Sequence, residues 1–256
     1  MANAFLGYNN IVDDGTLTSN SQQSTLAITN LQTRHLTEIW RAAGNTSVNI
    51  DLDAGSSKLV AAIWMGGTNL TGATNGMVIK ASDVKIGDSE LLNSTITPNV
   101  STTRDTLIRV LAAAITARYW RITLTDTGVT FIEAGRLFMG PILRPANNVF
   151  WSLPFRTITR TERKEMLGGQ TNVYGRPSIR ECDFRWGSLT EAELYGTFTP
   201  SIDRIAAEGK EVLFCLDETD TYVHEKMLWG DLIGLGAAIE LTKNLRAHDY
   251  TIRSIL

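Results

Sequence analysis

Two short stretches decide the fold class: Val48-Asn-Ile-Asp-Leu52 and Tyr119-Trp-Arg-Ile-Thr-Leu124. In each of them, apolar side chains recur at every second position and more polar ones stand between. Successive side chains of a β-strand point to opposite faces, so this alternation places one face in a core and the other in water. Both stretches are therefore predicted to be half-buried strands of an antiparallel sheet.

Further short strands are expected around these two stretches. The first part of the chain is rich in Thr, Ser, Asn and Gly, with β-branched runs between them, which is typical of many short strands joined by turns. One segment, Val110–Thr116, looks helical, although its alanines could equally end a strand. The pattern predicts an antiparallel β-sandwich. Its other candidate strands are Leu59–Met65, Met77–Ala81, Thr106–Val110 and Phe131–Met139.

A change in charge density divides the chain into two predicted domains. Residues 1–145 carry 11 basic and 11 acidic side chains, whereas residues 146–256 carry 13 and 16 and so hold the whole net charge of −3. Prolines and asparagines around Asn147 are typical of a linker. We therefore expect one domain over residues 1–146 and a second over residues 147–256.

The second domain is predicted to be β-rich with one short helical crossover, so that the whole chain is mainly β. Ser188-Leu-Thr-Glu191 has the form of a capping box and predicts a helix start. Pro200 is expected to end or bend this helix. The candidate strands of this domain are Arg156–Thr161, Asn172–Gly175, Ile179–Trp186, Val212–Leu216, Tyr222–Trp229, Ala237–Lys243 and Tyr250–Ile255.

Composition and charge exclude several classes of protein. The chain has 256 residues, of which 43% are hydrophobic and 20% charged, so it can bury real cores. A net charge of −3 argues against a nucleic-acid-coating protein. The longest apolar runs, Leu59–Met65 and Leu232–Leu241, are too short or too interrupted by glycine to cross a bilayer. The residues after Met1 lack the basic start and apolar run of a secretory signal, so synthesis in the cytoplasm is expected.

The sequence contains no motif that predicts catalysis, a metal or a cofactor. The three histidines, His35, His224 and His248, are far apart, and His224 is expected on an exposed strand. Cys182 and Cys215 are expected to be reduced thiols of a core. No glycine pair has the context of a phosphate-binding loop. The chain is predicted not to be an enzyme, and a glycoside hydrolase that uses Glu133 is the weakest alternative.

The linker and the polar strand after it are the predicted assembly surface. Arg156–Lys164 alternates polar residues and has little to bury, which fits either a solvated edge strand or a strand completed by a neighbouring subunit. Trp151, in the linker, is the best candidate for a contact between domains or between subunits. The candidate assembly contacts are Trp151, Phe155, Arg156, Arg160 and Arg163.

Five segments of the first domain share the order and spacing of the motifs of one known family: Asn30–Arg41, Val48–Gly55, Leu59–Trp64, Asn69-Leu70 and Ala117–Ile122. With these segments the first domain resembles the discoidin (coagulation-factor C-type) jelly-rolls. The resemblance covers roughly residues 1–143, but Ala54 separates Asp53 from Gly55 and the two stapling cysteines of the family are missing. It implies a jelly-roll fold and binding of glycans or lipid head groups through loops at one end of the sandwich, here through Asn69, Thr71, Thr74 and Asn75.

The jelly-roll is followed by a Pro-containing linker and by a β domain that contains Leu228-Trp-Gly230 and Ile239-Glu-Leu241 near its end. This complete arrangement is similar to tail-tip proteins of long-tailed bacteriophages, in particular distal tail proteins. This resemblance implies a virion structural protein, made in the host cytoplasm, that forms a ring of identical copies, a hexamer in that family. It also implies tail-tube and tail-hub proteins as partners, a cell-surface glycan as a further one, and neither nucleic acid nor membrane insertion. The alternative function is a carbohydrate-binding, receptor-contacting module.

Overall fold

The computed structural model shows two compact units, Gly7–Ile142 and a second that joins Met1–Leu6 to Leu143–Leu256. The sequence places the boundary after residue 146, whereas the division falls at Leu143. The first residues join the second unit because β1 (Phe5–Gly7) is hydrogen-bonded to β16 (Glu211–Cys215). The structure describes residues 3–44, 46–71, 76–85, 90–96, 99–149, 154–166, 170–235, 239–242 and 245–255.

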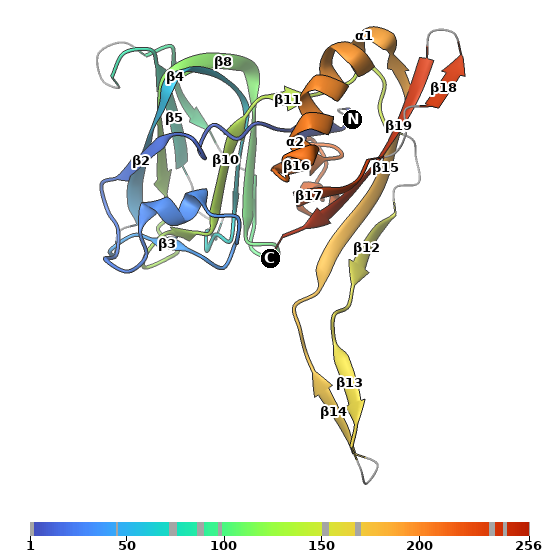
Figure 1. Cartoon of the computed structure of the whole chain (residues 1–256). Helices are drawn as coiled ribbons and strands as arrows, with labels where there is room; N and C mark the ends of the chain where they lie inside the picture. Colours follow the sequence, from blue (N-terminus) through green and yellow to red (C-terminus); the bar gives the residue numbers. More distant parts are fainter. Residues whose placement is uncertain are drawn as a thin grey trace. The chain divides into compact units, whose positions relative to one another are not determined.

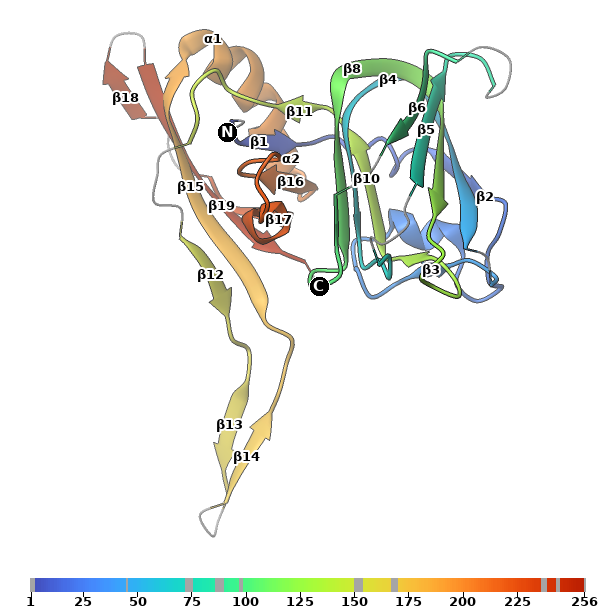
Figure 2. The same cartoon turned by 180° about the vertical axis from the view of Figure 1, so that it is seen from behind.

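Two long strands organise the first unit, which is an antiparallel β-sandwich as predicted. β4 (Ser47–Gly66) and β8 (Thr106–Thr125) pair along most of their length and arch from one layer into the other (Figures 1 and 2). Gly55 lies in the bend of β4 with a φ of +71°, which favours glycine. The remaining elements of this unit are β2 (Thr16–Ser19), η1 (Ile28–Gln32), β3 (Trp40–Arg41), β5 (Gly76–Ser82), β6 (Leu92–Ile96), β7 (Asn99–Ser101), β9 (Glu133–Ala134) and β10 (Arg136–Gly140).

The two layers follow from the pairing of the two halves of β4 and β8. One layer has the order β2, β4, β8, β5 and β6, and the other has β10, β4, β8 and β7. Alternate residues of both long strands, including Ile50 and Ile122 at 1% exposure each, fill the core between the layers. The helical character assigned to Val110–Thr116 is wrong, because this segment continues β8 where its register against β4 shifts.

The second unit contains an eight-stranded antiparallel sheet. Its order is β11, β1, β16, β17, β19, β15 and β12, and β18 pairs with β19 beside β17. Stacked aromatic rings, such as Phe184 and Phe214 with centroids 4.3 Å apart, pack on the sheet. Besides β1 and β16, this part of the unit contains β11 (Ile142–Leu143), β12 (Phe155–Ile158), β15 (Ile179–Thr190), η3 (Val223–Lys226), β17 (Met227–Leu235), β18 (Ile239–Thr242) and β19 (Leu245–Ser254).

One helical segment connects β15 to β16, as the crossover prediction requires. It runs through α1 (Glu191–Glu193), the π-helix η2 (Leu194–Asp203) and α2 (Arg204–Ala207). The capping box is Thr190 with Glu193 rather than Ser188 with Glu191, because β15 continues to Thr190 before the chain turns. Pro200 lies inside the segment and does not end it.

The helical segment is held to the sheet by polar as well as apolar contacts. Phe198 packs edge-on against Trp186, with centroids 5.1 Å apart. Asp203 accepts a hydrogen bond from the Tyr250 hydroxyl (3.2 Å) and lies 3.6 Å from Nε2 of His248. Burial lowers the pKa of His248, but the hydrogen bond and attraction of Asp203 outweigh burial and leave this pKa raised.

Candidate functional site

The polar face of the five-stranded layer carries two rows of side chains that cross β2, β4 and β8. Antiparallel register places directly opposed residues on the same face, so each row is a continuous strip. The sequence predicts this outward alternation for β4 and β8, but not which side chains meet. The first row is Thr18, Asp51 and Arg121, and the second is Thr16, Asp53 and Tyr119.

Two side-on ion pairs organise these rows. Nε and Nη2 of Arg121 donate to the two carboxylate oxygens of Asp51 at 2.6 and 2.8 Å. Arg118 binds Asp53 in the same way at 2.8 and 2.9 Å, and its guanidinium lies 4.8 Å from the ring centroid of Tyr119. Each pair leaves one Nη of the guanidinium for a further hydrogen bond. Outer lone pairs are left on both oxygens of Asp51 and on Oδ2 of Asp53, whose Oδ1 also accepts from the amide of Gly55 at 2.8 Å.

The pairs favour the charged forms of Asp53, Arg118 and Arg121. The hydrogen bond from Arg118, together with that from the amide of Gly55, holds the pKa of Asp53 below its ordinary value. The hydrogen bonds to Asp53 and Asp51 raise the pKa values of Arg118 and Arg121, respectively. The Asp53 carboxylate therefore stands beside charged guanidinium donors at neutral pH.

A hollow of about 240 Å³ opens between the rows. Pockets for drug-sized ligands measure about 300–1,000 Å³, so this hollow matches one small ring. A hydroxyl group both donates and accepts, and it can bind a carboxylate and a guanidinium at once. Sequence reasoning did not identify this site. The hollow is lined by Thr16, Thr18, Asp51, Leu52, Asp53, Lys85, Tyr119, Trp120 and Arg121.

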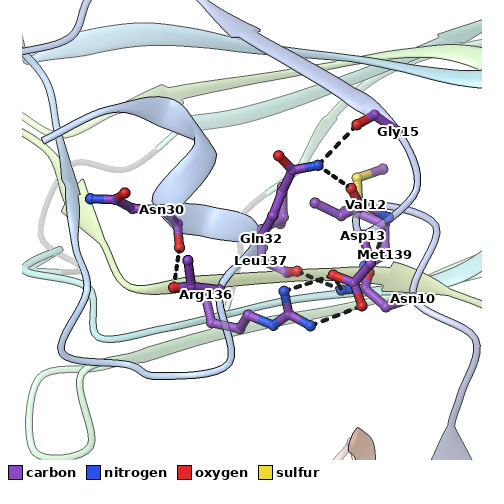
Figure 3. Close-up of polar contacts among 10 residues, drawn as sticks. Asn10, Val12, Asp13, Gly15, Asn30, Gln32, Arg136, Leu137 and Met139 are labelled. Carbon is purple, nitrogen blue, oxygen red and sulfur yellow. Dashed lines mark hydrogen bonds and ion pairs between the residues drawn. The ribbon is translucent and has the colours of Figure 1, made fainter. Parts of the chain in front are cut away.

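A buried guanidinium fixes the loop that leads into β2 and so positions Thr16 and Thr18. Arg136 is 1% exposed and binds both carboxylate oxygens of Asp13, at 2.7 and 2.9 Å (Figure 3). Gln32 donates from the other side to the carbonyls of Val12 (2.7 Å) and Gly15 (2.9 Å). The loop is therefore tied on two sides immediately before β2 begins.

The residues predicted to form a glycan loop have mainly internal partners. The Asn69 amide donates to the carbonyl of Phe131 (2.8 Å) and accepts from the amide of Glu133 (3.0 Å). The Thr71 amide and hydroxyl both bind the carboxylate of Asp126. Thr74 and Asn75 lie outside the described residues. A glycan site at this loop stays a prediction, whereas the hollow presents outward-facing polar groups.

The predicted assembly residues lie on β12 and on a separate hairpin. The Phe155 ring lies 6.3 Å from that of Phe214, and Arg156 pairs with Glu181, which is 2% exposed, and with Asp183. Arg160 is exposed between β12 and β13. Trp151 lies outside the described residues. Assembly through these side chains stays a prediction.

The hairpin itself consists of β13 (Glu162–Glu165) and β14 (Thr171–Tyr174), which pair only with each other among the described strands. All eight strand residues are exposed, including Arg163. Val173 is 60% exposed and Tyr174 49%. In both views the hairpin continues the ribbon of β12 and β15 (Figures 1 and 2).

Other chemically interesting residues have structural partners. Glu133 forms an ion pair with Arg41, 2.7 Å from Nη2. His224 is 7% exposed in η3, which corrects the expectation of an exposed strand. Cys182 and Cys215 are buried free thiols, as predicted, and burial raises the pKa of Cys182 to about 12.

The described part of the chain has two further properties. It contains no group of three or more His, Cys, Asp or Glu side chains that could hold a metal ion. None of the helices in it is long and apolar enough to cross a membrane.

No family model matches the sequence, and no curated protein does. Solved structures with a similar fold include chitosan-binding module 1 of a Paenibacillus sp. IK-5 chitosanase/glucanase, at 21% identity and a TM-score of 0.40, over 52% of this chain and 100% of that one. Another is the family 32 carbohydrate-binding module of Clostridium perfringens NanJ in complex with galactose. Its sequence identity is 12% and its TM-score 0.42, and the match covers 54% of this chain and 99% of that one. A third is a Streptococcus pneumoniae fucose-binding module, with 12% identity and a TM-score of 0.40, and the match covers 52% of this chain and 98% of that one. Similarity at this level assigns no ligand to this chain.

Proposed function

We propose that this chain is a carbohydrate-binding protein whose sandwich unit holds one sugar ring in the hollow on its polar face. The observation that carries the proposal is the pair of rows around the hollow, in which carboxylates, guanidinium groups and hydroxyls alternate beside Tyr119. Sugar hydroxyls need such neighbouring donors and acceptors, and an aromatic ring covers the C–H surface of a pyranose. Binding of this kind requires no catalytic group.

The proposal predicts weak, specific saccharide binding that depends on Arg121. A small, solvent-open site of this kind is expected to bind a monosaccharide with a Kd of roughly 0.1–1 mM. Arg121→Ala removes charged hydrogen bonds and should weaken binding about 10-fold or more. The measurement is an NMR titration of the full chain with a panel of neutral and acidic monosaccharides, in which resonances around the hollow should shift.

The matched control is Arg41→Ala. Arg41 forms the same kind of ion pair in the same unit, with Glu133, and its side chain is 32% exposed against 34% for Arg121. This variant should bind as the unaltered chain does. A panel in which no sugar shifts a resonance, or equal losses in the two variants, would count against the proposal.

A second candidate function is a structural role in a bacteriophage tail tip, where copies of the chain form a ring. The observation that favours it is the β13–β14 hairpin, whose strand residues are all exposed. A two-stranded hairpin alone in water is marginally stable at best, so a partner that covers Val173 and Tyr174 would stabilise it. The two functions are compatible, because a ring could display the sandwich units toward a cell-surface glycan.

The ring hypothesis predicts an oligomer whose mass depends on the hairpin. Light scattering of the full chain should give a multiple of the chain mass, and a Val173→Asp, Tyr174→Asp double variant should give a monomer, because charge opposes burial of that surface. Tyr222→Asp is the control, since Tyr222 is 67% exposed elsewhere in the same unit. A monomer at every protein concentration would refute this role.

A further inference from the structure

The charges around the hollow do not cancel. Asp51 is neutralised by Arg121, and Asp53 by Arg118, in side-on pairs with two hydrogen bonds each. Lys85 also lines the hollow. Among the described residues, no carboxylate lies within ion-pair distance of its ammonium group. Arg118 lies outside the lining of the hollow, but when it is counted with the Asp53 that it neutralises, these five charged groups sum to one excess positive charge, which is that of Lys85.

Lys80, a second lysine of this layer, forms an ion pair with a protein carboxylate. It lies in β5, opposite Arg121 in the register, and its ammonium group is 2.8 Å from Oε1 of Glu90. Lys85 follows the end of β5 and is exposed at the rim of the hollow. The two lysines therefore differ in two respects that matter for a ligand: Lys85 lines the hollow, and only Lys80 is paired with a protein carboxylate.

We infer that the sugar bound in the hollow carries a carboxylate, so that the ligand class is glycans with hexuronic acid units; this inference rests on the proposed function. The ligand carboxylate would accept from the ammonium group of Lys85 and from the Nη of Arg121 that the Asp51 pair leaves over. The ring hydroxyls would bind the outer lone pairs of Asp51 and Asp53. A charge-assisted hydrogen bond is about twice as strong as a neutral one, and a neutral sugar cannot form it with Lys85.

The test is calorimetry of the full chain with galacturonic acid, its methyl ester and galactose. The ester keeps the shape of the acid and removes its charge, so the comparison isolates the carboxylate. We expect the acid to bind about 3- to 10-fold more tightly than the ester, from one extra charge-assisted bond. Because the pair is solvent-exposed, this preference should shrink in 1 M NaCl.

Two variants locate the preference. Lys85→Gln should abolish it and leave the affinity for galactose within about 2-fold, whereas Lys80→Gln should preserve it. Equal affinities for the acid and the ester in calorimetry, together with resonance shifts around the hollow in the NMR titration, would overturn the inference and leave the proposed function standing. If no sugar binds at all, both fail. Tighter binding of a sulfated galactose than of galacturonic acid would assign the site to sulfate esters and overturn the inference that the ligand carries a carboxylate.

Discussion

Asp13→Ala is expected to lower the free energy of unfolding of the sandwich unit by about 3–5 kcal/mol. The reason is its partner rather than Asp13 itself. The Arg136 guanidinium is 1% exposed, donates a hydrogen bond from Nη2 to Oδ2 of Asp13 at 2.9 Å, and forms an ion pair with Oδ1 at 2.7 Å. Without Asp13 the buried guanidinium loses the ion pair and the hydrogen bond that this carboxylate supplies, at a place where Arg136 is only 1% exposed to water.

The expected loss has a local readout and two controls. Native-state hydrogen exchange at the amides of β4 and β8 reports the stability of this unit separately from the other. Asp14→Ala, at the exposed neighbouring position, should change stability by less than about 0.5 kcal/mol. Arg136→Met should cost less than Asp13→Ala, because the remaining carboxylate is 36% exposed and stays solvated. If Asp13→Ala behaves like Asp14→Ala, the buried pair does not stabilise the loop.

Gly230→Ala is expected to destabilise the second unit by about 3 kcal/mol or more. Gly230 lies in β17 opposite Ser254 of β19. A Cβ at this position would come within 1.8 Å of the backbone oxygen of Arg253 and 2.6 Å of its carbonyl carbon. Backbone cannot rotate away as a long side chain does, so two central strands would have to separate or change register.

The comparison variant for this prediction is Gly196→Ala. No heavy atom lies within 4 Å of the Cβ that this change would add, and Gly196 lies in the helical η2. Since alanine favours a helix over glycine, the change should stabilise the unit by up to about 1 kcal/mol. Urea denaturation followed by exchange at β17 and β19 amides measures both variants. If the Gly230→Ala and Gly196→Ala variants have equal free energies of unfolding, the close approach of β17 and β19 at Gly230 does not restrict the side chain there, and the prediction is wrong.

Local patterns predicted the strands well. The alternating stretches Val48–Leu52 and Tyr119–Leu124 are both strands, and they pair with each other in antiparallel register. Their apolar residues are buried, as the alternation requires. The mainly β class and the helical crossover of the second unit are likewise confirmed. A period of two residues is visible within a few positions, so no distant contact is needed to predict these strands.

The local errors arose where a neighbouring strand overrode a local preference. Val110–Thr116 is rich in alanine, yet it is carried along in β8 by its pairing with β4 and by the bend between the layers. The Ser188–Glu191 capping signal is also locally valid. Pairing of β15 with β19 extends to Thr190, however, and thereby moves the helix start two residues along the chain.

The sequence by itself determined which segments are strands, which of their faces are polar, and that no familiar catalytic motif is present. Only the tertiary structure decided which polar residues meet. Asp51 and Arg121 are 70 positions apart, and Asp13 and Arg136 are 123 apart. Neither pair has a local signal, because strand register, the bends of β4 and β8, and loop closure bring their members together. The hollow exists for the same physical reason: side-chain direction is local, whereas the neighbours of a side chain depend on the complete fold.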